Sequence, residues 1–108
     1  MKFSAATLPT EQVSDHGTRQ RVTGTGLECI FYTYQAGAVF ERHQHEAEQT
    51  TIVLSGELVF TFDDEELRLG AGEAVLIAGG KPHGAFVPED APETRTHNVF
   101  SPVRERLP

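Results

Sequence analysis

Short runs of β-branched and aromatic residues alternate with turn signals along most of this chain. Eight runs are rich in Val, Ile, Thr, Phe or Tyr, namely residues 27–34, 39–42, 50–54, 57–62, 65–69, 74–77, 83–87 and 94–100. Glycine, proline and acidic residues mark the breaks between them, as at Ser55-Gly56 and Gly79-Gly80. No stretch keeps a 3.6-residue period over three turns. The pattern therefore predicts an all-β chain folded as a small antiparallel sandwich or barrel.

The plainest hairpin lies in the middle of the chain. Leu58, Phe60 and Phe62 occupy alternate positions, so they share one face of a strand, and we expect that face to point into the core. Asp63-Asp64 follows directly and predicts the turn. Gly56 supplies a permissive backbone where the preceding strand reverses.

Length and periodicity indicate one domain. A chain of 108 residues falls within the size of a single hydrophobic core, and 38% hydrophobic residues with ten glycines is typical of a folded protein. Residues 1–26 show little periodicity, so we expect an N-terminal arm or edge strand there. Residues 27–108 then form the barrel.

Charge disfavours several partners, and the cysteine content and hydropathy exclude several structural features. Nine Lys and Arg residues against sixteen Asp and Glu residues leave a net charge of −7, which disfavours nucleic acid and anionic membranes. The single cysteine, Cys29, excludes an internal disulfide and a CxxC motif. No apolar run is long enough to span a bilayer, and no signal-like segment precedes Pro9. We expect a soluble, cytoplasmic protein.

Two histidines stand two residues apart after one of the predicted strands. Side chains two apart project from the same face of a strand, so His43 and His45 would converge at the spacing that a shared metal needs. Histidine pairs also occur on exposed strands without a metal. This pair alone leaves both interpretations open.

The residues around this pair carry a more specific pattern. Its fixed positions are Gly37, His43, His45, Gln49 and Gly56, followed by Gly72, Ala78, Gly79-Gly80, Pro82 and His83. This pattern, over residues 37 to about 86, resembles the two motifs of the cupin superfamily. The resemblance implies a jelly-roll barrel, or double-stranded β-helix, that holds one divalent metal ion. The implied ligands are His43, His45, Gln49 and His83.

The sequence departs from those motifs at three positions. Glutamate is usual where this chain has Gln49, proline where it has Ala78, and an asparagine after the last histidine where it has Val87. An amide carbonyl can still bind a metal, but it is neutral, so the site keeps the metal's charge and favours an anionic or carboxylate ligand. Glu48 is the alternative fourth ligand. Imidazole and amide donors suit Zn, Ni, Fe, Mn or Co, and the sequence does not choose among them.

The C-terminal segment gives a second resemblance. Asn98 and Phe100 share one face of the last predicted strand, and Arg104 follows the turn at Ser101-Pro102. This tail is similar to that of small cupins from pectin and alginate breakdown, which open the ring of 4,5-unsaturated uronates. The resemblance implies that Phe100 packs against the sugar ring and that Arg104 binds its carboxylate.

One position in that tail does not match. The family has a catalytic aspartate where this chain has Asn98, and an asparagine cannot transfer a proton. Acid–base chemistry would then fall to a water on the metal, to Glu41 or to His97. His97 and Asn98 are neighbours on one strand, so only one of them can point into the barrel.

Three functions remain compatible with these residues. The first is a metal-dependent enzyme of carbohydrate breakdown that opens or isomerises an unsaturated uronate or a related sugar acid. The second is a non-catalytic cupin that binds a small ligand with its metal; the absence of an attached output domain weighs against it. The third is an Fe(II)-dependent oxygenase. A barrel whose histidines hold no metal is the least favoured alternative.

Exposed sheet edges suggest self-association. The apolar run from Cys29 to Tyr32 is long enough to pair or pack with a second copy, so we expect a homodimer.

Overall fold

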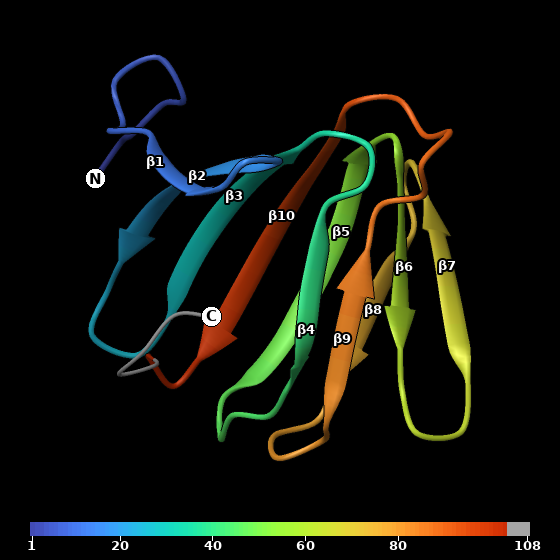
Figure 1. Cartoon of the computed structure of the whole chain (residues 1–108). Helices are drawn as coiled ribbons and strands as arrows, with labels where there is room; N and C mark the ends of the chain where they lie inside the picture. Colours follow the sequence, from blue (N-terminus) through green and yellow to red (C-terminus); the bar gives the residue numbers. More distant parts are fainter. Residues whose placement is uncertain (104–108) are drawn as a thin grey trace.

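The computed structural model describes residues 1–103, which form ten β-strands and no helix (Figure 1). The strands are β1 (Glu11–Ser14), β2 (Gly17–Thr23), β3 (Glu28–Tyr34), β4 (Val39–His43), β5 (Glu48–Ser55), β6 (Glu57–Thr61), β7 (Glu66–Gly70), β8 (Ala74–Ile77), β9 (His83–Phe86) and β10 (Thr94–Ser101). The prediction of an all-β chain is confirmed.

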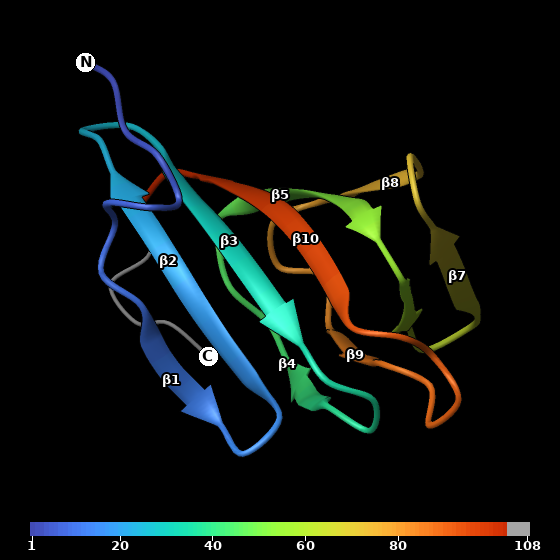
Figure 2. The same ribbon diagram turned by 90° about the horizontal axis from the view of Figure 1, so that it is seen from above.

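The strands form two antiparallel sheets that face each other (Figures 1 and 2). One sheet has six strands in the order β1-β2-β3-β10-β5-β8, and the other has four in the order β4-β9-β6-β7. Successive strands often lie in different sheets, which is the connectivity of a jelly roll. All eight predicted runs are strands.

Two strands, β1 and β2, come from the segment with little periodicity. β2 pairs with β3 along its whole length, from Gly17 opposite Tyr34 to Thr23 opposite Glu28. The side chains of these strands are largely polar and only partly buried, because β1 is an edge strand. Hydrophobic alternation, the signal that identified the other eight strands, is therefore weak here.

The core lies between the sheets. β3 points Ile30, Tyr32 and Tyr34 inward, and each of these side chains is at most 4% exposed. The predicted inward side chains of β6, Leu58 and Phe60, are each 3% exposed. Burying large apolar side chains from both sheets against one another provides the main stabilisation of such a sandwich.

A glycine marks the crossing from one sheet to the other. Gly56 joins β5 of the six-stranded sheet to β6 of the four-stranded sheet, with a backbone φ of +83°. A Cβ atom at this position would also overlap the backbone of Thr94. Both constraints require glycine here, as the sequence predicts. The hairpin that follows is also confirmed, since Phe60 of β6 pairs with Leu67 of β7.

The run from Cys29 to Tyr32 is not at a sheet edge. It belongs to β3, which is hydrogen-bonded to β2 on one side and to β10 on the other. Edge-to-edge pairing through this run is therefore excluded, because its backbone groups are already paired. Its outward side chains, Cys29 and Phe31, are half-buried, and Phe31 stacks on His97 with ring centroids 4.7 Å apart. A homodimer contact through this outer face stays a prediction.

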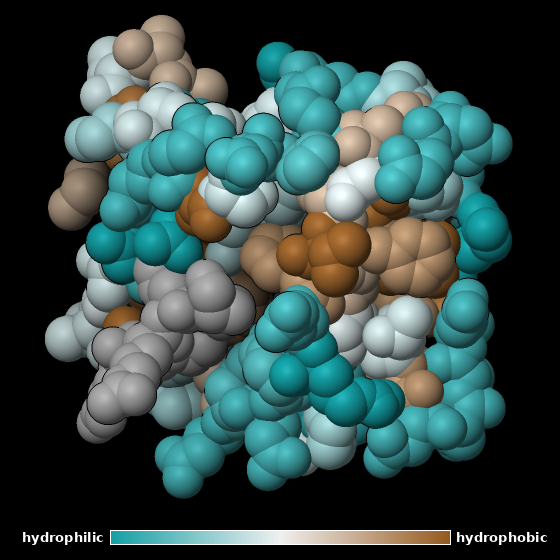
Figure 3. All heavy atoms as spheres, in the orientation of Figure 1, coloured by the Kyte–Doolittle hydropathy of each residue, from teal (hydrophilic) through white to brown (hydrophobic). Residues whose placement is uncertain are grey.

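The surface over the four-stranded sheet is mostly hydrophilic, with a hydrophobic patch near its middle (Figure 3). β4 carries an exposed valine, Val39, whose register partner on β9 is Phe86. Among residues 1–103, no helix is long and apolar enough to cross a membrane.

Candidate metal centre

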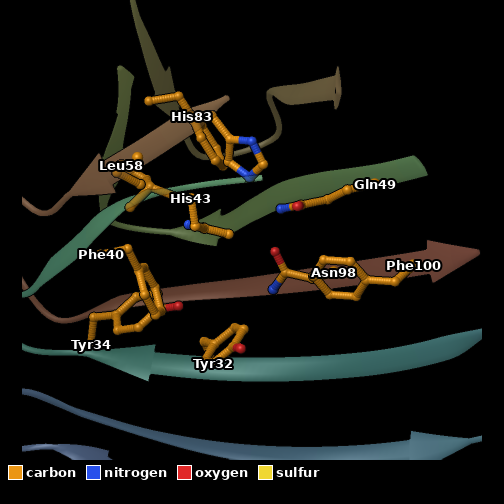
Figure 4. Close-up of a pocket in the computed structure, with 12 residues that line it drawn as sticks. Tyr32, Tyr34, Phe40, His43, Gln49, Leu58, His83, Asn98 and Phe100 are labelled. Atoms are coloured by element: carbon orange, nitrogen blue, oxygen red, sulfur yellow. The ribbon is translucent and has the colours of Figure 1, made fainter. Parts of the chain in front are cut away.

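Three histidines from two motifs meet at one end of the barrel. His43 ends β4, His83 begins β9 directly opposite it in the sheet, and His45 lies in the loop that leads to β5. Each ring offers one nitrogen, and the three nitrogens lie within 4.8 Å of one another. In Figure 4, His43 and His83 lie beside the space that Gln49 and Asn98 approach from the other sheet.

Backbone carbonyls fix the tautomer of all three rings. Each ring has its Nδ1 atom 2.8 to 2.9 Å from the carbonyl oxygen of a residue two positions away in sequence. A carbonyl oxygen only accepts hydrogen bonds, so each Nδ1 carries the hydrogen. In the neutral ring, Nε2 then holds the lone pair. This is the tautomer that a metal-binding histidine needs, with its second nitrogen held by the protein.

The fourth predicted ligand comes from the opposite sheet. Gln49 of β5 is 6% exposed, and its side-chain oxygen Oε1 lies 3.1 Å from Nε2 of His45. Its neighbour Glu48 points to the other face of the strand and is exposed. The alternation of side chains along β5 therefore brings Gln49, and not Glu48, to His45. Three imidazoles and one amide oxygen form a donor set that suits a divalent transition metal.

Two glycines of the second motif hold the loop that carries His45. The backbone N–H of Gly80 donates to the carbonyl of His45 at 2.7 Å. Gly79 packs so closely on the loop that a Cβ atom would overlap the carbonyl oxygen of Glu46. These glycines therefore do more than form a turn, because they allow two distant backbone segments to touch beside the candidate metal ligands.

A mainly aromatic pocket opens beside the histidines (Figure 4). Sequence analysis did not identify most of its wall, which includes Tyr32, Tyr34, Phe40, Leu58 and Phe60. The signal was present, since the inward positions of β3 alternate with period two. None of the described residues that line the pocket is acidic.

Buried polar side chains form a row along the floor of the pocket. Nε2 of Gln49 donates to the hydroxyl of Thr51 at 3.0 Å, and this hydroxyl donates to Oδ1 of Asn98 at 2.6 Å. Nδ2 of Asn98 donates to the carbonyl of Ile30 at 3.1 Å and to the hydroxyl of Thr96 at 2.9 Å. Asn98 therefore faces inward, and its amide group is fully engaged with the protein.

The remaining candidate residues do not all lie at the metal site. Phe100 is 2% exposed, and its ring lies against His45 with centroids 5.7 Å apart. His97 faces the outside of the barrel, and the side chain of Glu41 is exposed. Neither His97 nor Glu41 lines this pocket, but Glu41 lines a neighbouring pocket that also borders His43. Arg104 lies outside the described residues.

Comparison with known proteins agrees with this fold. The model of the Cupin domain family matches residues 30–100, which is well over half of the chain. The chain belongs to the cupin family. The chain is also similar to part of a larger protein, the HTH-type transcriptional regulator PuuR of Escherichia coli, with 41% identity over 58 residues. That match covers 53% of this chain and 31% of the regulator, so the chain spans under a third of this curated relative.

Two solved cupin structures are similar over nearly the whole chain. KdgF from Halomonas sp. is 27% identical with a TM-score of 0.86, and the match covers 95% of this chain and 94% of that one. Oxalate decarboxylase of Bacillus subtilis, a protein with Mn(II) centres, is 21% identical with a TM-score of 0.79. This second match covers 93% of this cupin and 29% of the decarboxylase, and it shows the shared fold.

Proposed function

We propose that this cupin binds one divalent metal ion and uses it to act on a small carboxylate. The reaction that we favour is ring opening or isomerisation of an unsaturated uronate or a related sugar acid. One observation carries the proposal: the ring nitrogens of three histidines lie within 4.8 Å of one another, and the side-chain oxygen of Gln49 lies 3.1 Å from one of them, beside a pocket whose lining contains no acidic residue.

Charge supports an anionic substrate. All four ligands are neutral, so the centre keeps the full positive charge of the ion, whereas the chain as a whole carries −7. When bound, the metal would supply Lewis-acid polarisation of a hydroxyl or carbonyl oxygen. The resemblance of the C-terminal segment to uronate-opening cupins and the likeness to KdgF both favour a sugar acid.

The chain's own residues would bind and orient this substrate. Phe100 keeps its predicted role of packing against the sugar ring, and Tyr32 lines the same pocket. Arg104 keeps its predicted role as the partner of the substrate carboxylate. Asn98 holds no transferable proton, so we assign no acid–base step to it.

Ultraviolet absorption tests the reaction directly. We expect a 4,5-unsaturated uronate, generated by a lyase, to lose its conjugated double-bond absorption when the metal-loaded protein is added. His45→Ala should abolish the loss, because it removes a metal ligand, whereas His97→Ala on the outer face should leave it unchanged. Absence of any loss from a protein that demonstrably holds metal would overturn the proposed reaction.

A binding module is the second candidate, and the hydrogen bonds of Asn98 favour it. Both hydrogens of its amide go to the protein, at the position where the uronate-opening cupins carry an acid–base carboxylate. The similarity to a transcriptional regulator points the same way. Calorimetric binding of a uronate without turnover would favour this candidate. Oxygen consumption by the Fe(II)-loaded protein would favour the oxygenase instead.

A further inference from the structure

We propose that Asn98 and Thr51 are positioning residues that make Gln49 present its carbonyl oxygen, and not its NH2 group, to the three histidines. They act through a directed row of hydrogen bonds across three strands. This inference rests on the metal site of the proposed function, and it assigns the orientation of the Gln49 amide to two residues that are not themselves metal ligands.

The direction of the row begins at a backbone carbonyl. The oxygen of Ile30 on β3 can only accept, so the group of Asn98 that faces it at 3.1 Å must be the NH2 group. The second hydrogen of this group goes to the hydroxyl of Thr96. The remaining atom of the amide, Oδ1, therefore points along the sheet to Thr51 on β5.

The next two bonds pass this direction on to the candidate ligand. The hydroxyl of Thr51 has one hydrogen, which must go to Oδ1 of Asn98 because that oxygen only accepts. The hydroxyl oxygen then accepts from Nε2 of Gln49 at 3.0 Å. With its nitrogen held in this way, Gln49 turns its oxygen to His45, at 3.1 Å from Nε2. A reversed amide would present hydrogens, which cannot bind a cation.

Burial and register make the row rigid. Thr51 is 0% exposed, Asn98 is 4% exposed and Gln49 is 6% exposed, so water is largely excluded as a substitute partner. Asn98 stands opposite Ile30 on β3 and opposite Thr51 on β5 in the strand register, which places all three on one rung of the sheet. Reversing the amide of Gln49 would set its oxygen against the hydroxyl oxygen of Thr51, whose only hydrogen already goes to Asn98, so two buried acceptors would face each other.

Cobalt affinity tests the inference without requiring any activity. We expect Thr51→Val, which keeps the shape but removes the hydroxyl, to weaken Co²⁺ binding by about 10- to 100-fold, as the loss of a hydrogen bond to a metal ligand typically does. Thr51→Ser restores the hydroxyl and should bind Co²⁺ within about threefold of the original chain. Spectroscopic titration with Co²⁺ gives the affinities, and thermal unfolding with a chelator shows that each variant folds.

A double-mutant cycle separates orientation from general damage to the pocket. Both oxygens of a carboxylate accept, so Gln49→Glu removes the need to orient this ligand. In that background, Thr51→Val should change Co²⁺ affinity by no more than about threefold. Equal losses in both backgrounds, or unchanged affinity in Thr51→Val alone, would overturn the positioning role and leave the metal site intact. An original chain that binds no Co²⁺ would instead overturn the site and this inference together.

Discussion

The two walls of the candidate metal site are built in different ways. The histidine wall consists of His43, His45 and His83, and each ring is held by a carbonyl only two residues away in sequence. The amide wall is formed by side chains of the six-stranded sheet. There, Thr51 bonds to Asn98 across 47 residues, and Asn98 bonds to Ile30 across 68 residues.

This difference explains what each wall contributes. A ring tethered by its own segment keeps its tautomer wherever that segment is placed, so the fold needs only to bring the histidine segments together. The amide wall has its hydrogen-bond direction only when β3, β10 and β5 lie in the correct register. The histidines thus supply the donors, and the sheet decides which atom of the amide joins them.

Removing one imidazole should reduce metal binding more than any change in the amide wall. We expect His83→Ala to abolish metal retention, because it removes a buried ligand that the amide wall cannot replace. His97→Ala is the matched control, since that ring stacks on Phe31 outside the barrel. Metal content after gel filtration, measured by mass spectrometry, checks both. Full metal content in His83→Ala would mean that this histidine is not a ligand.

A smaller change can test how the two histidine motifs are held together. A methyl group on Gly79 would meet the carbonyl of Glu46, so Gly79→Ala should push the His45 loop away. We expect a loss of about 1–3 kcal/mol in unfolding free energy, as for other overpacked sites. Metal affinity should fall as well.

Gly26→Ala is the control for this variant, because nothing lies within 4 Å of a Cβ atom there. Chemical denaturation with and without metal measures both effects. If Gly79→Ala and Gly26→Ala behave alike, the glycine does not hold the loop.

The same contrast explains what the sequence could predict. The spacing of His43, His45, Gln49 and His83 indicated four side chains that the structure brings together, because the two family motifs fix their positions along the chain. Strand alternation does not explain His45, which lies in the loop after β4. Alternation does separate Asn98 from His97. The row through Thr51 could not be found, since a single sequence does not contain the register between β5 and β10.

The strands at the margin of the sheet were expected only as an N-terminal arm or an edge strand, for another reason. β1 and β2 lie at its edge, where polar side chains face water and hydrophobic alternation fades. Tyr32 and Tyr34 do alternate inward, but only the fold shows that the space before them adjoins the histidines.

The smallest expected effect on stability concerns a water-exposed contact in the six-stranded sheet. Glu11 on the edge strand β1 accepts a hydrogen bond from Arg21 at 2.8 Å, and this guanidinium lowers the pKa of the Glu11 carboxyl below its usual value. A lowered pKa in the folded state stabilises the protein above the ordinary pKa, and this contribution is lost as the pH falls through the lowered one.

We therefore expect Glu11→Gln to unfold at a slightly lower temperature than the original chain at neutral pH. The difference should vanish in acid, below the lowered pKa of Glu11, and should also shrink in high salt, because exposed ion pairs are screened. Thermal unfolding across a pH series measures it. A gap that widens on acidification would contradict the assignment. A gap as large as that of Gly79→Ala would show that water-exposed contacts stabilise this barrel as much as its buried ones.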